Sequence, residues 1–207
     1  EETTAIMRQN PFIDACVRGE GEEVFAELLG ARIRGGAPPE IKGLTVRRAD
    51  GSVVDFGGRG VFKNLNELPS IYNEEFLAGF PPGEIFYHSE RGCKNSCKYC
   101  TLGPPLRFKD ISIVEKELKA IFDTRNITYV NIWDSDLTWD INRFKQILRM
   151  VDRFNKDGKK VSVNYGFLET DKEILELLGR NINRIIMGFQ STNKETTQLA
   201  GRAVYDL

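Results

Sequence analysis

From residue 84 onward, the sequence alternates between short apolar runs and amphipathic stretches. Runs suited to strands cover 84–88, 127–133, 161–165 and 184–189; helical patterns cover 113–123, 141–155 and 172–178, and another begins near residue 193. Such alternation predicts parallel strands joined by right-handed crossovers. We therefore expect an α/β fold in which residues 84–207 form the N-terminal part of a (β/α) barrel, since a full barrel needs ~250 residues. An open doubly wound sheet is the competing topology.

A shorter α/β pattern precedes this region. Residues 12–17 suit a strand, and residues 22–29 place Val24, Phe25, Leu28 and Leu29 on one helical face. One strand and one or two helices bury too little to fold alone. The chain also begins with Glu1 rather than Met. We therefore expect residues 1–36 to be the end of a domain that starts earlier in a longer protein.

Residues 37–83 are rich in Gly and Pro and predict a linker. Within it, residues 43–48 and 52–56 have the composition of strands and flank Ala49-Asp50-Gly51. Asp-Gly between two such runs indicates a β-hairpin. We expect an ordered linker that carries one small hairpin.

The composition is that of an ordinary globular protein. Of 207 residues, 41% are hydrophobic and 29% are charged, and the formal net charge is −1. This balance gives no indication of a nucleic-acid or anionic-membrane partner. No apolar run approaches the ~18 residues of a membrane span, and the first residues lack the features of a secretory signal. A cytoplasmic location is therefore expected.

Three of the four cysteines fall within one stretch of eight residues. Cys93, Cys97 and Cys100 have the spacing Cys-x3-Cys-x2-Cys and follow the first barrel-type strand, at the end where β/α barrels carry their active sites. Three thiolates can occupy three corners of a [4Fe–4S] cluster and leave the fourth iron open. Catalytic metal sites keep such an open position. The upstream Cys16 is expected to be a buried strand residue.

Two other interpretations of the cysteines stay open. One is a structural zinc site completed by Cys16 or His88, although paired Cys-x2-Cys units are more usual for zinc. The other is an electron-transfer cluster without catalysis. His88 is the only histidine, and a single histidine at a strand end more often serves packing or hydrogen bonding. Nearby positive charge, from Lys94, Lys98 and Arg107, would stabilise thiolates or be solvated on the loop.

The cysteine spacing, the preceding Arg91-Gly92 and the aromatic Tyr99 resemble the radical S-adenosylmethionine (SAM) superfamily. The resemblance implies that the three cysteines ligate a [4Fe–4S] cluster. SAM would chelate the open iron, and an electron from the cluster would release a 5′-deoxyadenosyl radical. It also implies that the backbone of Tyr99 contacts the adenine of SAM.

Two downstream segments extend this resemblance. Residues 133–138 are similar to the Asp-rich segment of cobalamin-binding radical SAM subfamilies, so that Asp134, Ser135 or Asp136 would accept the amino group of SAM. Asp136 could equally cap the next helix. Residues 188–193 resemble the segment that contacts the ribose or carboxylate of SAM, with Gln190 in place of the usual Glu and Ser191 as in the family. The alternative is a helix start capped by Ser191 or one of the two residues that follow it.

The N-terminal region resembles the end of a Rossmann-like cobalamin-binding domain. The similarity lies in Gly19-Glu20-Gly21-Glu22 before an amphipathic helix, and residues 65–69 are similar to the end of the linker that follows in that group. Gly-Glu runs also occur as plain strand–helix turns. The predicted division is therefore 1–36, a domain remnant; 37–83, a linker; and 84–207, a partial barrel. Cobalamin would bind only in the full-length protein.

The resemblance implies a radical SAM enzyme, such as a cobalamin-dependent methyltransferase or an enzyme of a related radical transformation. A small-molecule or peptide substrate and an electron donor such as flavodoxin or ferredoxin would be its partners, without a membrane or nucleic acid. A methylthiotransferase has a similar order of domains and is one alternative. A zinc-stabilised binding module is the alternative from another class.

Overall fold

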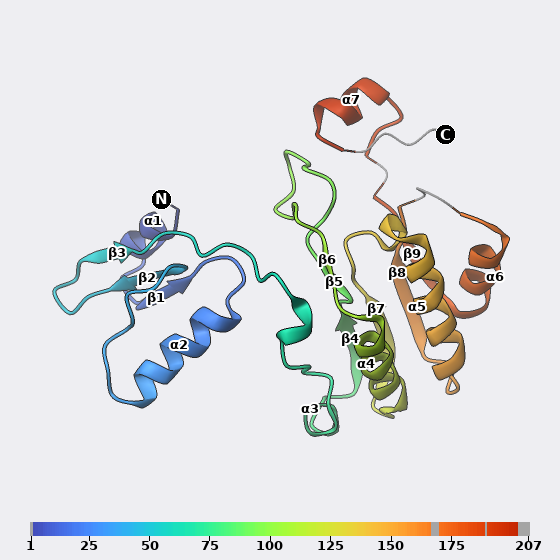
Figure 1. Cartoon of the computed structure of the whole chain (residues 1–207), viewed down its shortest axis with the longest axis horizontal. Helices are drawn as coiled ribbons and strands as arrows, with labels where there is room; N and C mark the ends of the chain where they lie inside the picture. Colours follow the sequence, from blue (N-terminus) through green and yellow to red (C-terminus); the bar gives the residue numbers. More distant parts are fainter. Residues whose placement is uncertain (1, 167–169, 189, 203–207) are drawn as a thin grey trace. The chain divides into compact units, whose positions relative to one another are not determined.

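The computed structural model describes residues 2–166, 170–188 and 190–202, which form two compact units (Figure 1). The first unit ends at Lys63 and the second begins at Asn64.

The first unit is a small antiparallel sheet with two helices. Its elements are α1 (Glu2–Gln9), β1 (Ala15–Val17), α2 (Glu22–Ile33), β2 (Leu44–Arg47) and β3 (Val53–Asp55). The strand order is β1-β2-β3, and both pairings are antiparallel. The hairpin of β2 and β3 confirms the Asp-Gly prediction, because Gly51 adopts a φ of +84° that glycine tolerates. Val24, Leu44 and Val46 form its buried hydrophobic cluster, and Met7 of α1 is also buried.

Helix α2 differs from the predicted amphipathic pattern. Val24 is fully buried and Leu28 packs against it, but Phe25 is 56% exposed and Leu29 is 46% exposed. Of the four side chains that the sequence places on one helical face, only Val24 and Leu28 therefore belong to the hydrophobic cluster. A sheet with strands of three or four residues covers only one row of helix side chains, which explains the difference.

Strand β1 shares its sheet with the hairpin from the predicted linker. Cys16 lies in β1, half-buried, and its Cα is paired with that of Thr45 in β2. The assignment of residues 1–36 to a cobalamin-binding domain, and the boundaries at residues 36 and 83, stay predictions.

The second unit contains a four-stranded parallel sheet, β4 (Gly83–Tyr87), β7 (Ile127–Ile132), β8 (Lys160–Asn164) and β9 (Arg184–Ile186). The strands lie in the order β4-β7-β8-β9, which is their order in the chain. Helices α4 (Ile111–Asp123), α5 (Ile141–Phe154) and α6 (Lys172–Asn181) connect them, and α7 (Lys194–Leu199) follows the last strand. The shorter elements are η1 (Leu65–Glu67), α3 (Glu74–Ala78), β5 (Glu90–Arg91), β6 (Arg107–Phe108) and η2 (Leu137–Trp139).

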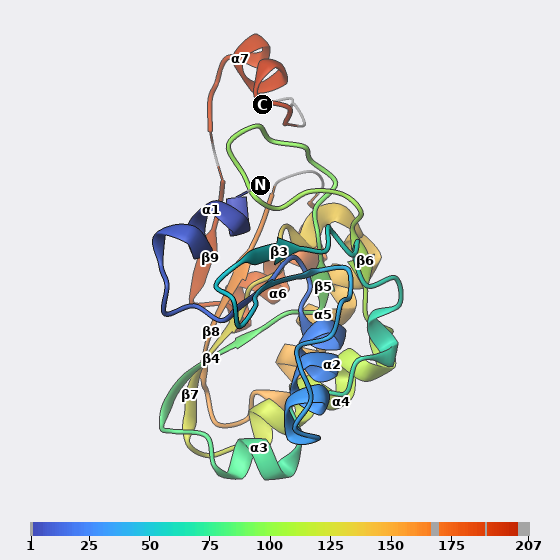
Figure 2. The same cartoon turned by 90° about the vertical axis from the view of Figure 1, so that its left-hand side faces the viewer.

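The three connecting helices pack side by side on one face of this sheet, α4 against α5 and α5 against α6 (Figures 1 and 2). Side chains along each strand point alternately to the two faces of the sheet, and one set packs against the helices. In this set, Ile85, Val130 and Val161 lie side by side in register. Tyr87, Ile132 and Val163 form a second such row. All of these are buried. A doubly wound sheet reverses its strand order and carries helices on both faces. Consecutive strand order with the helices on one face instead fits the wall of a (β/α) barrel. The predicted α/β class with a parallel sheet is confirmed.

Across the described ranges, we find no helix that combines the length and the apolar character needed to cross a lipid bilayer.

Candidate cofactor-binding site

The candidate site lies where the strands of the parallel sheet end. The carboxyl ends of parallel strands meet at one edge of a sheet. Here that edge carries the segment after β4, the segment between β7 and α5, and the end of β8. Short antiparallel strands β5 and β6 bracket the cysteine loop, which we define as residues 92–106.

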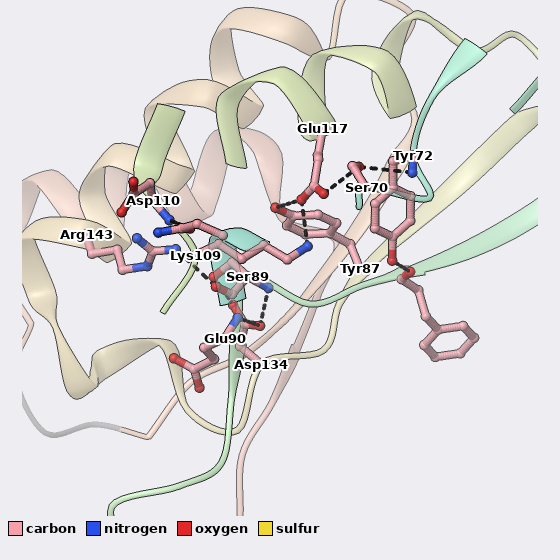
Figure 3. A network of polar contacts seen from close by, with 12 residues as sticks. Ser70, Tyr72, Tyr87, Ser89, Glu90, Lys109, Asp110, Glu117, Asp134 and Arg143 are labelled. Carbon is pink, nitrogen blue, oxygen red and sulfur yellow. Dashed lines mark hydrogen bonds and ion pairs between the residues drawn. The ribbon is translucent and has the colours of Figure 1, made fainter. Parts of the chain in front are cut away.

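Asp134 joins the first two of these segments (Figure 3). Its side chain is fully buried; one carboxylate oxygen accepts the backbone N–H of Ser89 at 2.7 Å and that of Glu90 at 3.2 Å, and the other accepts the Ser89 hydroxyl at 2.5 Å. Arg143 of α5 donates to the backbone carbonyl of Ser89 at 3.2 Å. Both oxygens of Asp134 are thus used to fix the end of β4 against the end of β7.

Glu90 forms a second contact between the same two segments, because its side chain accepts hydrogen bonds from Ser135. Its Oε1 accepts the backbone N–H of Ser135 at 2.9 Å and the Ser135 hydroxyl at 2.6 Å, and the side chain is almost completely buried. Burial and the neighbouring Asp134 raise the pKa of Glu90 to about 8. Burial also raises the pKa of Asp134. Two buried carboxyl groups therefore lie next to the cysteine loop, and Glu90 keeps its proton at neutral pH.

The sequence reasoning did not identify Glu90. It lies directly before Arg91-Gly92, but no local pattern distinguishes it from a solvated acidic residue. Its burial depends on Asp134 and Ser135, which are 44 and 45 positions away.

Asp136 caps a helix, which is one of the two roles that the sequence predicted for it, and uses only one carboxylate oxygen to do so. Its Oδ1 accepts the N–H of Thr138 at 3.0 Å and the Thr138 hydroxyl at 2.6 Å, so it caps η2. Its Oδ2 lies against Gly166, where an added Cβ would be only 1.6 Å away. Within the described part of the chain, no donor hydrogen-bonds to this Oδ2. Gly166 therefore leaves room for a carboxylate oxygen that has no donor among the described residues.

Asn164, at the end of β8, adds a second open acceptor. Its amide nitrogen donates to the backbone carbonyl of Asp134 at 2.6 Å. Its Oδ1 is buried and has no hydrogen-bond donor among the described residues. Asn164 and Asp136 thus offer acceptor oxygens at the ends of neighbouring strands.

The three cysteines of the loop are free thiols in different environments. Cys93 is half-buried, Cys97 is buried and Cys100 is exposed. The backbone N–H of Asn95 donates to the Sγ of Cys93 at 3.4 Å. Gly92 brings the two ends of the loop together, because its φ is +87° and an added Cβ would lie 2.1 Å from the carbonyl oxygen of Pro105.

The donor set fits an iron–sulfur cluster by its chemistry. Three thiols on one loop match three corners of a [4Fe–4S] cube. Among the described residues, however, no three His, Cys, Asp or Glu side chains are gathered closely enough to hold a metal ion. A cluster would therefore require the three sulfurs to lie closer together than they do here; of the three, Cys100 is the exposed one.

Lys94 connects this loop to the segment that carries Asp136. Its ammonium group donates to the carbonyl of Trp139 at 2.9 Å and lies 5.4 Å from the centre of the Trp139 ring. Trp139 is in η2, which Asp136 caps. The cysteine loop and the acidic segment are therefore parts of one site.

The other predicted SAM contacts are more peripheral. Tyr99 is 58% exposed on the loop, and Gln190 is also exposed. The Ser191 hydroxyl accepts the N–H of Asn193, and Asn193 caps α7 by accepting the N–H of Thr196, so the cap is Asn193. Within the described ranges, we find no hydrogen bond between these side chains and residues 134–136.

A buried ion pair holds the exit of the cysteine loop (Figure 3). Glu117 of α4 accepts hydrogen bonds from Lys109 at 2.7 Å, from the Tyr87 hydroxyl at 2.9 Å and from the Ser70 hydroxyl at 2.6 Å. Burial and Glu117 raise the pKa of Tyr87 well above its usual value, so the phenol keeps the proton that it donates. The backbone of Lys109 also donates to the carbonyl of Ser89 at 3.0 Å. The chain after the loop is therefore fixed to α4 and to the end of β4.

Comparison with known proteins gives matches in sequence and in structure, although no family model matches the chain. An uncharacterized methyltransferase, PH0819 of Pyrococcus horikoshii, is 28% identical over 208 residues, covering 85% of this chain and 45% of that protein. The cobalamin-dependent radical SAM methyltransferase TokK of Streptomyces tokunonensis is 30% identical over 110 residues, covering 47% of this chain and 15% of TokK. The chain thus spans less than half the length of these relatives.

Solved structures show the same fold. The radical SAM methyltransferase TsrM of Kitasatospora setae, solved with a tryptophan substrate and a SAM analogue, matches with a TM-score of 0.71 at 19% identity, over 98% of this chain and 43% of TsrM. The cobalamin-dependent radical SAM enzyme OxsB matches with a TM-score of 0.68 at 16% identity, over 96% of this chain and 31% of OxsB. The predicted resemblance to cobalamin-binding radical SAM enzymes is confirmed.

Proposed function

We propose that this chain is the cluster-binding and SAM-binding part of a cobalamin-dependent radical SAM methyltransferase. The observation that carries the proposal is the position of the cysteine loop. It starts at the carboxyl end of β4 and is tied through Lys94 to the acidic segment after β7. When bound, the cluster would supply the electron that cleaves SAM.

Cys93, Cys97 and Cys100 are the proposed cluster ligands. The N–H of Asn95, which donates to the Sγ of Cys93, would stabilise the negative charge on that sulfur. Lys94 adds a positive charge whose position is fixed by Trp139. The loop thus offers both the ligands and charge compensation for a cluster.

Asp136 is the proposed acceptor for the ammonium group of SAM. Asp134 uses both carboxylate oxygens on Ser89 and Glu90, and the Ser135 hydroxyl donates to Glu90. The Oδ2 of Asp136 lies beside Gly166 and has no hydrogen-bond donor among the described residues. The open Oδ1 of Asn164 is a second acceptor for the same group. This choice among the three candidates follows from which oxygens already have partners.

The relatives support the methyltransferase class and suggest the other partners. TsrM was solved with cobalamin, with a [4Fe–4S] cluster and with tryptophan as substrate. We infer that the whole protein binds cobalamin, acts on a small molecule or peptide and receives electrons from a donor such as flavodoxin or ferredoxin. Tyr99, Gln190 and Ser191 are inferred to complete the SAM site once SAM binds. A soluble, cytoplasmic enzyme fits this chemistry.

The substitution Cys97→Ala tests the proposal against a zinc-stabilised binding module. In a radical SAM enzyme it should abolish reductive SAM cleavage, measured as 5′-deoxyadenosine formed under dithionite, while the melting temperature changes little. In a zinc module it should mainly unfold the protein, because metal binding there is folding energy. Cys16→Ala is the matched control, since Cys16 lies in β1 of the first unit. Unchanged SAM cleavage in Cys97→Ala would contradict the proposal.

A further inference from the structure

Helix α7 ends in a motif that requires glycine. Gly201 follows the C-cap Ala200 and has a φ of +77°. Its N–H donates to the carbonyl of Gln198 at 2.9 Å, and the N–H of Arg202 donates to that of Thr197 at 3.1 Å. These two bonds define a Schellman motif, in which the left-handed position is usually glycine.

The end of this helix lies against the cysteine loop (Figures 1 and 2). The backbone N–H of Ser96 donates to the carbonyl of Gly201 at 3.2 Å, and that of Lys98 donates to the carbonyl of Ala200 at 3.0 Å. These two residues flank Cys97 on either side. The carbonyls of the C-cap Ala200 and of Gly201, directly after α7, thus accept hydrogen bonds from the loop that carries the cysteines.

Gly201 also permits the close approach of the two segments. An added Cβ would lie 2.5 Å from the carbonyl oxygen of Ser96 and 3.7 Å from the Cα of Cys97. The first distance is shorter than any real Cβ contact, and its neighbour is backbone rather than a flexible side chain. Even one methyl group at this position must therefore separate α7 from the loop.

We propose that Gly201 is a positioning residue for the cysteine loop: the end of α7 holds the backbone on both sides of Cys97 and so sets where that thiol stands. This inference rests on the proposed function, because it assigns a purpose to the position of Cys97. It concerns a residue 104 positions away from that cysteine. With Lys94 fixed at Trp139, the stretch between Cys93 and Cys100 is held from two sides.

The test compares Gly201→Ala with Gly158→Ala in the intact protein. Both residues have a positive φ, but an added Cβ at Gly158 meets nothing within 4 Å. The two substitutions therefore share the backbone strain and differ in the contact with the loop. Without metal, amide hydrogen exchange of a peptide spanning residues 96–98 should become on the order of tenfold faster in Gly201→Ala, because two hydrogen bonds are lost. It should stay at the wild-type rate in Gly158→Ala.

Cluster retention gives the second readout. After anaerobic reconstitution, Gly201→Ala should lose its iron to a chelator several-fold faster than the wild type and show an altered EPR signal in the reduced state. Gly201→Asn provides the same test if the Ala variant folds poorly. Asn tolerates a left-handed conformation, and its Cβ would still meet the carbonyl oxygen of Ser96. Exchange and iron loss at wild-type rates in both Gly201 variants would overturn the inference. A wild type that takes up no iron would instead refute the proposed function, and the exchange comparison would still decide the role of Gly201.

Discussion

Glu90 and Asp134 place two carboxyl groups in one buried position beside the cysteine loop, and this has a consequence for pH. Burial and Asp134 hold the pKa of Glu90 at about 8, against 4.5 for an unperturbed Glu. Between these values the folded protein keeps a proton that the unfolded chain has lost. Stability therefore falls as the pH rises through this window. Below about 4.5 Glu90 adds no pH dependence, and above about 8 its contribution to stability has been lost in full and no longer changes with pH.

Glu90→Gln should flatten this pH dependence. Gln keeps an acceptor oxygen for Ser135 and cannot ionise. Thermal melts of the metal-free protein between about pH 5 and pH 8 should show the wild type losing several degrees more than the variant. A smaller slope remains in the variant, since burial also raises the pKa of Asp134, although hydrogen bonds from Ser89 and Glu90 and the charge of Arg143 oppose this shift. Glu84→Gln, on the exposed side of β4, is the control, and equal slopes in the wild type and Glu90→Gln would contradict the assignment.

Asp136→Asn should weaken SAM binding by roughly ten- to a hundredfold, because a charge-assisted hydrogen bond contributes about 1.5–3 kcal/mol. Asn preserves the cap on η2, since it offers the same Oδ1 to Thr138. Calorimetric titration of the cluster-loaded protein with SAM measures the effect. Asp140→Asn, which caps α5 a few residues away, should bind SAM like the wild type. If Asp136→Asn binds SAM with wild-type affinity, the ammonium group is received elsewhere.

For single residues, the sequence predicted only those roles that follow from positions close together in the chain. Cys93, Cys97 and Cys100 stand close together in the chain, so their common chemistry is visible without a fold. The roles of Glu90 and Gly201 depend on contacts with residues 45 and 105 positions away, and no local pattern indicates such contacts. For Asp136 the sequence offered two roles: the structure shows the cap on η2, and the contact with SAM stays a proposal.

Among the secondary-structure elements, α4 connects the cysteine loop to the sheet through Glu117. Glu117→Ala would leave Lys109 without its carboxylate beneath Tyr87 and should destabilise the protein by about 3 kcal/mol. Glu115→Ala on the same helix removes an exposed pair with Arg153 and should cost less than about 1 kcal/mol. Urea unfolding of both variants measures the difference. Equal losses would mean that the buried pair does not hold the loop exit in place.

The long elements were predictable because their side chains repeat. The four parallel strands and helices α4, α5 and α6 were expected within a few residues of their observed bounds. The two-residue strands β5 and β6 were not, because they exist only through pairing with each other. Helix α2 was predicted from its periodicity, but the periodicity did not indicate which side chains are buried. The small sheet buries Val24 and leaves Phe25 exposed.

For the whole molecule, alternation of strand and helix predicted the parallel sheet, and the consecutive strand order supports a barrel wall rather than a doubly wound sheet. The end of the first compact unit was harder to predict from the sequence. The structure groups residues up to 63 into one compact unit, since β1 pairs with the hairpin from the predicted linker. Pairing between segments separated by a helix and a long loop leaves no trace in local composition.

Anaerobic reconstitution of the intact protein tests the central claim most directly. With iron and sulfide supplied, we expect about four iron and four sulfide ions per chain, bound through Cys93, Cys97 and Cys100. We also expect the EPR signal of the reduced cluster to change when SAM is added. Stoichiometric zinc in place of iron, with no response to SAM, would contradict the assignment of these cysteines as cluster ligands.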